Sequence, residues 1–249
     1  ERSRGCLREW KTVADSRDRR SLACANQREK KEMKRVAILM AVVCCAPTHH
    51  QSKPYFTASS GKYKFENVVD LGDINEEQLA KTARGIQALA DSGAGFVTMR
   101  INSPGGSIFG GLEFTRNMED MKKRHGFRVA CVVDGVAMSM AAVILESPLC
   151  DVRLATNRSL LLFHNGSTGA RGNAGDLRQA GSFLDAVNSA MSLIVSHRLC
   201  LDVGVYRARL ALGDWVLSVE DAIAVNAIDG IAAPDDIAPP VITGRDLPL

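Results

Sequence analysis

The sequence predicts an α/β fold with a largely parallel sheet over residues 65–232. Two observations support this prediction. Short β-type runs alternate with longer stretches whose apolar residues recur at helical spacing, and the candidate functional residues fall at or just after the predicted strand ends. Strands and helices that alternate in this way form parallel sheets covered by helices. Because such sheets build their sites at the carboxyl ends of the strands, we expect the functional residues to meet there.

The first predicted elements are a strand over 65–71 and the helix that follows it. Asn75, with Gln78 three residues later, resembles a capping box at the start of this helix. Its apolar residues at helical spacing are Leu79, Ala83, Ile86 and Ala90. The chain therefore begins its regular part with a strand and a crossover helix.

The next elements continue the alternation. In order, they are a half-buried strand in which Val97, Met99 and Ile101 alternate, a turn at Ser103-Pro104-Gly105-Gly106, a helix over 108–123, a buried strand over 128–133, a turn at Asp134-Gly135, a short apolar helix and a buried strand over 160–163.

A long helix is expected after Asp176. Its apolar stripe consists of Ala180, Leu184, Val187, Met191 and Ile194, and Phe183 and Val195 widen it. One stripe normally packs a helix on its own domain. The extra breadth also leaves room for a second contact, to another subunit.

Charge is concentrated at the N-terminus. Residues 1–32 hold ten Lys and Arg against six Asp and Glu, a net +4, so the other 217 residues carry −1 of the overall +3. No basic face for nucleic acid remains in the body of the protein. We expect the basic leader at 1–32 to be disordered or non-native. The apolar fraction of 46% and charged fraction of 24% are those of an ordinary globular protein.

The segment 33–46 resembles an export signal. Met33-Lys34-Arg35 is a basic start, an apolar run over 36–43 follows, and small residues end at Ala46. If Met33 is the start of the protein, the product is exported to the periplasm; otherwise the segment is an apolar N-terminal stretch of a cytoplasmic protein. Residues 47–64 are then a linker, and 233–249 a Pro-rich C-terminal tail.

The seven cysteines do not predict a disulfide framework. Cys131, Cys150 and Cys200 lie in apolar or helical runs, where a free cysteine behaves as a small hydrophobic residue. No C-x-x-C occurs, and His49-His50 has no neighbours at zinc spacing. We expect neither a metal nor a cofactor.

Ser139 is the candidate nucleophile. It stands between a predicted strand and the apolar helix that begins at Met140. A serine in this position can simply be an N-cap, its oxygen accepting a backbone N–H. Alternatively, it presents its hydroxyl where the helix N-terminus favours negative charge. The upstream Gly-Gly turn supports the second interpretation. Gly106 lacks a Cβ and can approach a substrate carbonyl, so its N–H and that of Met140 would form an oxyanion hole.

His164 is the candidate base. The apolar strand over 160–163 would deliver it beside the strand end that leads to Ser139. Imidazole suits this task because its ordinary pKa is near neutrality. A lone histidine at a strand end is more often structural, as we expect for His125 and His197. For the orienting acid, Asp214 competes with Asp176, Asp185 and Asp202 on sequence alone.

Four segments resemble the Clp-type serine peptidases, the ClpP fold of the ClpP/crotonase superfamily. They are Ile101-Asn102-Ser103-Pro104-Gly105-Gly106, Gly135-Val136-Ala137-Met138-Ser139-Met140, Leu162-Phe163-His164, and Asp214-Trp215-Val216-Leu217-Ser218 with Glu220-Asp221-Ala222 and Ile228-Asp229-Gly230-Ile231 after it. The separations of 25 residues from Ser139 to His164 and 50 from His164 to Asp214 fit the same pattern.

The resemblance implies a spiral of repeated β-β-α units with a protruding long helix. It also implies a serine endopeptidase with a Ser139–His164–Asp214 triad, acting on peptides or proteins and assembled as a ring. His164-Asn165 and the loop over 172–177 further resemble the head-maturation proteases of tailed phages.

Some departures from the family pattern limit what the resemblance implies. Met138 replaces a small residue before the nucleophile, and the link at 122–126 is long. The N-terminal loops that engage an unfolding ATPase have no counterpart, so an ATPase partner is doubtful. Two alternatives stay open: a crotonase-like enzyme acting on acyl-thioesters, and a catalytically inactive Clp-like assembly protein.

Overall fold

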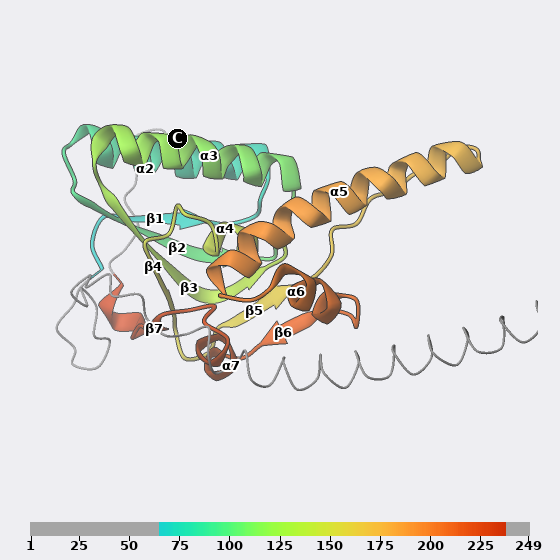
Figure 1. The fold of residues 1–249 in the computed structure, drawn as a ribbon. Helices are drawn as coiled ribbons and strands as arrows, with labels where there is room; N and C mark the ends of the chain where they lie inside the picture. The colour runs from blue at the N-terminus through green and yellow to red at the C-terminus, as the bar shows by residue number, and fades with distance from the viewer. Residues whose placement is uncertain (1–64, 238–249) are drawn as a thin grey trace, which may run out of the picture. The chain divides into compact units, whose positions relative to one another are not determined.

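The computed structural model describes residues 65–237, an α/β arrangement built on one twisted sheet (Figure 1). The predictions for 1–32, for 33–46, for the linker at 47–64 and for most of the tail at 233–249 lie outside these residues. The described elements are β1 (Val68–Leu71), α2 (Glu76–Asp91), β2 (Phe96–Ser103), α3 (Ile108–His125), β3 (Arg128–Met138), α4 (Met140–Leu145), β4 (Val152–Ala155), β5 (Leu160–Phe163), α5 (Ala174–Arg198), α6 (Val203–Leu210), β6 (Trp215–Leu217), α7 (Val219–Ala224), β7 (Gly230–Ile231) and the 3-10 turn η1 (Pro234–Asp236).

The sheet confirms the predicted parallel α/β class. Its main path runs β1-β2-β3-β4-β7, and every pairing along this path is parallel. β5 leaves the path by pairing in parallel with the last part of β3, and β6 then pairs with β5 in the antiparallel sense. Helices α2 and α3 lie side by side over one face of the sheet (Figure 1).

Most predicted elements form close to their expected bounds. The Asn75 side chain accepts a hydrogen bond from the Gln78 N–H at 2.9 Å, so the predicted N-cap of α2 is present. The second helix extends two residues beyond Lys123, because Gly126 adopts a left-handed φ of +76° and ends it. β1 begins only at Val68, while Phe65 instead bridges Ile237, which joins the start and end of the described chain.

One predicted turn is wrong. Asp134-Gly135 does not end the third strand, since β3 continues to Met138. Gly135 has a φ of +120° and lies against the side chain of Asn102, and from Val136 onward the strand pairs with β5 instead of β4. This change of partner extends β3 to the residue before Ser139, which is why Ser139 and β5 become neighbours.

The expectation of free Cys131 and Cys150 is also wrong, because the two form a disulfide. Cys131 lies in the middle of β3 and Cys150 just before β4, its parallel neighbour. Their Cα atoms are 5.5 Å apart, within the range for a disulfide. Apolar context identified both as buried, but only the pairing of β3 with β4 brings them together. Cys200 is free, as expected.

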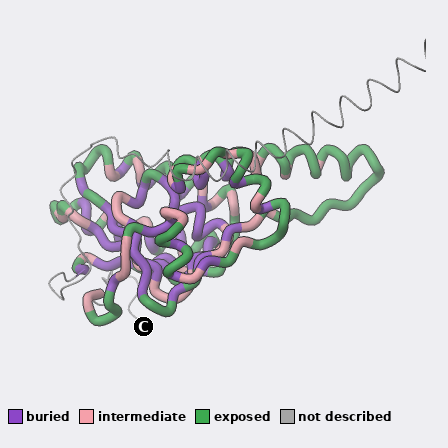
Figure 2. Tube along the Cα trace, turned by 60° about the horizontal axis from the view of Figure 1, so that its bottom comes forward, coloured by how far each residue is buried: buried purple, intermediate pink, exposed green. Residues whose placement is uncertain are grey.

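The long helix α5 projects from the body of the described domain (Figures 1 and 2). It begins at Ala174, earlier than expected, because Asn173 and Asp176 form a reciprocal capping box. Only its C-terminal part is buried, at Met191, Ser192, Val195 and Ser196. Among the described residues, no helix has both the length and the apolar character that a membrane span requires.

Candidate active site

Ser139 occupies a strained turn between β3 and α4. Its φ of +54° is rare for a residue with a side chain. Although it holds the N-cap position of α4, its side chain makes no capping hydrogen bond. The structure therefore disfavours the capping interpretation. Backbone strain at a sharp strand-to-helix turn is a recurring way to expose a nucleophile.

His164 lies directly against Ser139. Its Nε2 atom is 2.7 Å from the Ser139 Oγ, which is hydrogen-bonding distance. The register between β3 and β5 produces this contact: Met138 pairs with Leu162, and the Ser139 N–H donates to the Leu162 carbonyl at 2.9 Å. Each of the two residues directly follows its strand, so the parallel pairing of β3 and β5 places them at the same sheet edge, as predicted.

Asp214 faces the other side of the imidazole. In the antiparallel pair β5–β6, Phe163 lies opposite Trp215, and the next positions along are His164 and Asp214. The Asp214 Oδ1 is 4.0 Å from the His164 Nδ1, which is ion-pair distance but longer than a hydrogen bond. The Asp214 side chain is 66% exposed.

The rival carboxylates have other roles or positions. Asp176 closes the capping box of α5, and Asp202 caps α6 by accepting from the N–H groups of Gly204 and Val205. Asp185 is exposed on α5. Within residues 65–237, the carboxylate paired with His164 is that of Asp214.

The Gly-Gly turn packs on Ser139, although through a different glycine than predicted. A Cβ at Gly105 would lie 2.7 Å from the Ser139 Cβ and 3.2 Å from the Met140 nitrogen. A Cβ at Gly106 would instead collide with the backbone of Ile74, which bridges this residue. Of the two glycines, Gly105 is therefore the one that packs against Ser139, a role that the sequence did not reveal.

The two expected oxyanion donors remain available. Met140 is the first residue of α4, so its N–H has no acceptor within the helix. Within residues 65–237, neither the Met140 N–H nor the Gly106 N–H forms a turn, loop or cap hydrogen bond. Backbone N–H groups beside a nucleophile can stabilise an oxyanion.

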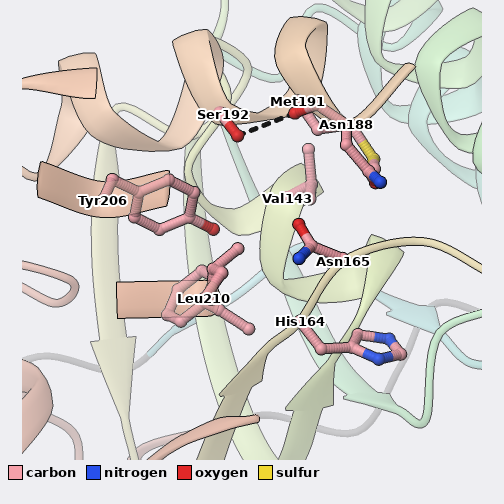
Figure 3. Close-up of a pocket in the computed structure, with 9 residues that line it drawn as sticks. Val143, His164, Asn165, Asn188, Met191, Ser192, Tyr206 and Leu210 are labelled. Carbon is pink, nitrogen blue, oxygen red and sulfur yellow. Dashed lines mark hydrogen bonds between the residues drawn. The ribbon is translucent and has the colours of Figure 1, made fainter. Parts of the chain in front are cut away.

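A small pocket opens beside His164 (Figure 3). Its lining is mostly apolar with a few amides and hydroxyls, and consists of Val143, Phe163, His164, Asn165, Asn188, Met191, Ser192, Tyr206 and Leu210. The Asn188 Oδ1 accepts from the Gly166 N–H at 2.7 Å, which ties the segment after His164 to α5. Asn188 could not be predicted as a pocket residue from the sequence, because the periodicity of α5 identifies only its apolar positions.

An ion-pair cluster around the buried Arg153 and Glu146 lies at the C-terminal end of α4. Arg153 is 2.6 Å from a carboxylate oxygen of Glu146 and 2.6 Å from one of Asp229. Burial raises the pKa of Glu146 to about 8, against the opposing effect of Arg153. Within the described chain, the second oxygen of Glu146 has no hydrogen-bond partner. The cluster connects the helix that follows Ser139 to β4 and to the segment before β7.

Comparison of the sequence with known proteins shows which family it resembles. The family model described as Clp protease matches residues 58–235. An ATP-dependent Clp protease proteolytic subunit of Deinococcus radiodurans is 28% identical over 169 residues, which cover 67% of this chain and 80% of the relative. An ATP-dependent Clp protease proteolytic subunit 1 of Prochlorococcus marinus (strain MIT 9312) is also 28% identical over 169 residues, with 66% and 83% covered.

Proposed function

The chain belongs to the Clp protease family, and on that basis we propose that Ser139, His164 and Asp214 are the catalytic triad of this serine-type endopeptidase. The hydrogen-bonding distance of 2.7 Å between the Ser139 Oγ and the His164 Nε2 carries the assignment. A hydroxyl needs an adjacent base to become a nucleophile, and this contact supplies one. We assign the peptidase domain to 65–232; the bridge from Phe65 to Ile237 supports an extension to residue 237.

The mechanism follows from the geometry. The Ser139 Oγ attacks the peptide carbonyl while His164 Nε2 takes its proton. Asp214 stabilises the resulting imidazolium, and the N–H groups of Gly106 and Met140 hold the oxyanion. His164 then donates the proton to the leaving amine, which leaves an acyl-enzyme on Ser139. Water, deprotonated by His164, hydrolyses this ester and restores the enzyme.

The pocket beside His164 suits a small, neutral substrate side chain. Apart from His164 itself, none of its lining residues is ionisable at neutral pH. A charged side chain would lose its hydration there without gaining a partner of opposite charge. We expect peptides with a small neutral residue at the cleavage site to be cut faster than matched peptides with Asp or Lys.

Assembly would use α5. Leu177, Phe183 and Leu193 of this helix are about half exposed or more, and Phe183 stacks on the exposed Phe109 with ring centroids 6.0 Å apart. Exposed apolar side chains grouped in this way favour a contact with another copy of the chain. We propose a homo-oligomeric ring. Light scattering should report a lower mass for Phe183→Glu, but not for Ser182→Glu, which adds the same charge at the neighbouring exposed position.

Both curated relatives are named as ATP-dependent proteolytic subunits. We propose that this chain hydrolyses short peptides without ATP, because its own residues supply the nucleophile, the base and the oxyanion donors. An unfolding partner would then matter only for folded protein substrates.

Labelling with a fluorophosphonate tests the triad. The probe should modify Ser139 in the folded protein, as located by peptide mass spectrometry, and the heat-denatured protein should not react. Ser139→Ala should lose the labelling and lower peptide turnover by roughly four to six orders of magnitude. Wild-type turnover in Ser139→Ala would refute the assignment. Binding of coenzyme A without labelling would instead indicate an acyl-thioester enzyme, and neither signal an inactive assembly protein.

A further inference from the structure

Trp215 directly follows Asp214 and lies in a cluster of aromatic rings. Its ring centroid is 5.9 Å from that of Phe163 and 6.2 Å from that of Tyr206, and these two rings pack edge to face at 6.3 Å. Phe163 is also the cross-strand partner of Trp215 and the residue directly before His164. The rings therefore join the two backbone segments that carry the base and the acid.

Arg209 lies over the same indole ring. Its guanidinium carbon is 5.5 Å from the Trp215 ring centroid, within the range of a cation–π contact. Its Nη1 also donates to the Gly213 carbonyl at 3.4 Å. Arg209 thus contacts the residues on both sides of Asp214, one through its ring and the other through its backbone.

Asp214 has little other support. β6 is only three residues long, and among the strands of residues 65–237 it pairs with β5 alone. The preceding turn is solvated, with Leu212 83% exposed and Gly213 at a φ of +117°. Within residues 65–237, the basic side chain at ion-pair distance from the Asp214 carboxylate is His164, at 4.0 Å. A short strand at a sheet edge does not hold its first residue firmly unless a side chain anchors it.

We propose that Trp215, in contact with the rings of Phe163 and Tyr206 and with the guanidinium of Arg209, is the positioning residue that keeps Asp214 opposite His164. This proposal rests on the triad proposed above. Trp215 touches neither substrate nor proton; it acts through Asp214 and sets the separation of the carboxylate from the imidazole. Cross-strand aromatic contacts stabilise the pairing of strands, and the pairing of β5 with β6 is what holds Asp214 opposite His164.

A double-mutant cycle distinguishes this role from a general effect on folding. Trp215→Ala should lower kcat for a fluorogenic peptide by roughly 10- to 100-fold with little change in KM, because only the orientation of the base is lost. In an Asp214→Ala background, the same change should cost less than about threefold, since the acid that it positions is absent. Trp215→Phe should recover most of the activity.

Arg209→Ala provides a second test if Trp215→Ala folds poorly. Arg209 is only partly buried, and its removal should lower kcat by about three- to tenfold, again only when Asp214 is present. Arg207→Ala, on the exposed side of the same helix, removes an equal charge and should leave kcat unchanged. Far-ultraviolet circular dichroism checks that each variant is folded.

The outcomes separate the two proposals. If Asp214→Ala lowers kcat but Trp215→Ala and Arg209→Ala cost the same in both backgrounds, the positioning role is refuted and the triad stands. If Asp214→Ala retains wild-type kcat, both the acid of the triad and the role of Trp215 are refuted. The proposal is supported if Trp215→Ala and Arg209→Ala each lower kcat in the wild-type background but do not lower it further in the Asp214→Ala background.

Discussion

Gly105 packs against Ser139 so closely that the site has no room for a side chain between them. A Cβ at Gly105 would lie 2.7 Å from the Ser139 Cβ and 2.7 Å from the Met138 carbonyl oxygen. Both atoms belong to the strained turn that presents the nucleophile, and neither is the free end of a flexible side chain. The turn that contains Gly105 and the segment around Ser139 therefore pack with complementary shapes.

Gly105→Ala should consequently abolish most peptidase activity. The added methyl group must displace Ser139 or the turn, and an error of about 1 Å in a catalytic group costs roughly 100-fold in rate. Gly93→Ala is the matched control, because Gly93 also has a positive φ, +80°, but a Cβ there would meet nothing within 4 Å. Equal loss of kcat/KM in the two variants would mean that backbone strain, and not the contact with Ser139, is responsible.

Asp214→Asn should lower kcat by about two to four orders of magnitude. An amide cannot stabilise the imidazolium that forms when His164 takes the serine proton. The separation of 4.0 Å and the exposure of Asp214 favour the lower end of this range. Steady-state kinetics measure the effect, with Asp185→Asn on the exposed part of α5 as the control. A change of less than threefold would remove Asp214 from the triad.

Glu146 should make stability depend on pH between about 4.5 and about 8. Burial raises the pKa of this carboxyl from the ordinary 4.5 to about 8 in the folded protein. As pH rises through this window, the unfolded chain releases the proton while the folded chain retains it. The contribution to the free energy of unfolding is therefore fully present below pH 4.5 and lost above about 8.

Glu146→Gln should flatten that dependence, because an amide does not titrate. Urea unfolding at several pH values between 5 and 8 measures the slope, and the exposed Glu113→Gln serves as control. By contrast, Arg153→Met should destabilise the protein by about 3–5 kcal/mol near pH 8, because it leaves the buried Glu146 and the more exposed Asp229 without their cation. An unchanged slope in Glu146→Gln would show that other groups cause the pH dependence.

The Cys131–Cys150 disulfide closes a loop of the chain that contains Ser139, because Ser139 lies between the two cysteines in the sequence. Replacing both cysteines by alanine should lower the free energy of unfolding by about 3 kcal/mol, as expected for a closed loop of this length. Urea unfolding of the oxidised protein measures the difference. Reductant should bring the wild type to the stability of the double variant, whereas Cys200→Ala should respond to reductant as the wild type does.

Local patterns located most of the fold and two members of the proposed triad. Apolar spacing and the capping residue Asn75 placed the main helices and strands, because these signals act between residues close in sequence. His164 could be anticipated because it directly follows an apolar strand. Asp214 was the least certain member on sequence, since Asp176, Asp185 and Asp202 competed with it, and the family resemblance is what strengthened its assignment.

By itself, the sequence determined the parallel α/β class, the main helices and strands, and that Ser139 and His164 each follow a strand of the same sheet. Only the tertiary structure decided the partner change of β3, the Cys131–Cys150 bond, the pairing of Arg153 with Glu146 and the contact of Gly105 with Ser139. The physical reason is the separation along the chain over which each kind of interaction acts. Propensity and periodicity act within a few residues, whereas these contacts depend on the register between separate segments, which the packing of the whole domain selects.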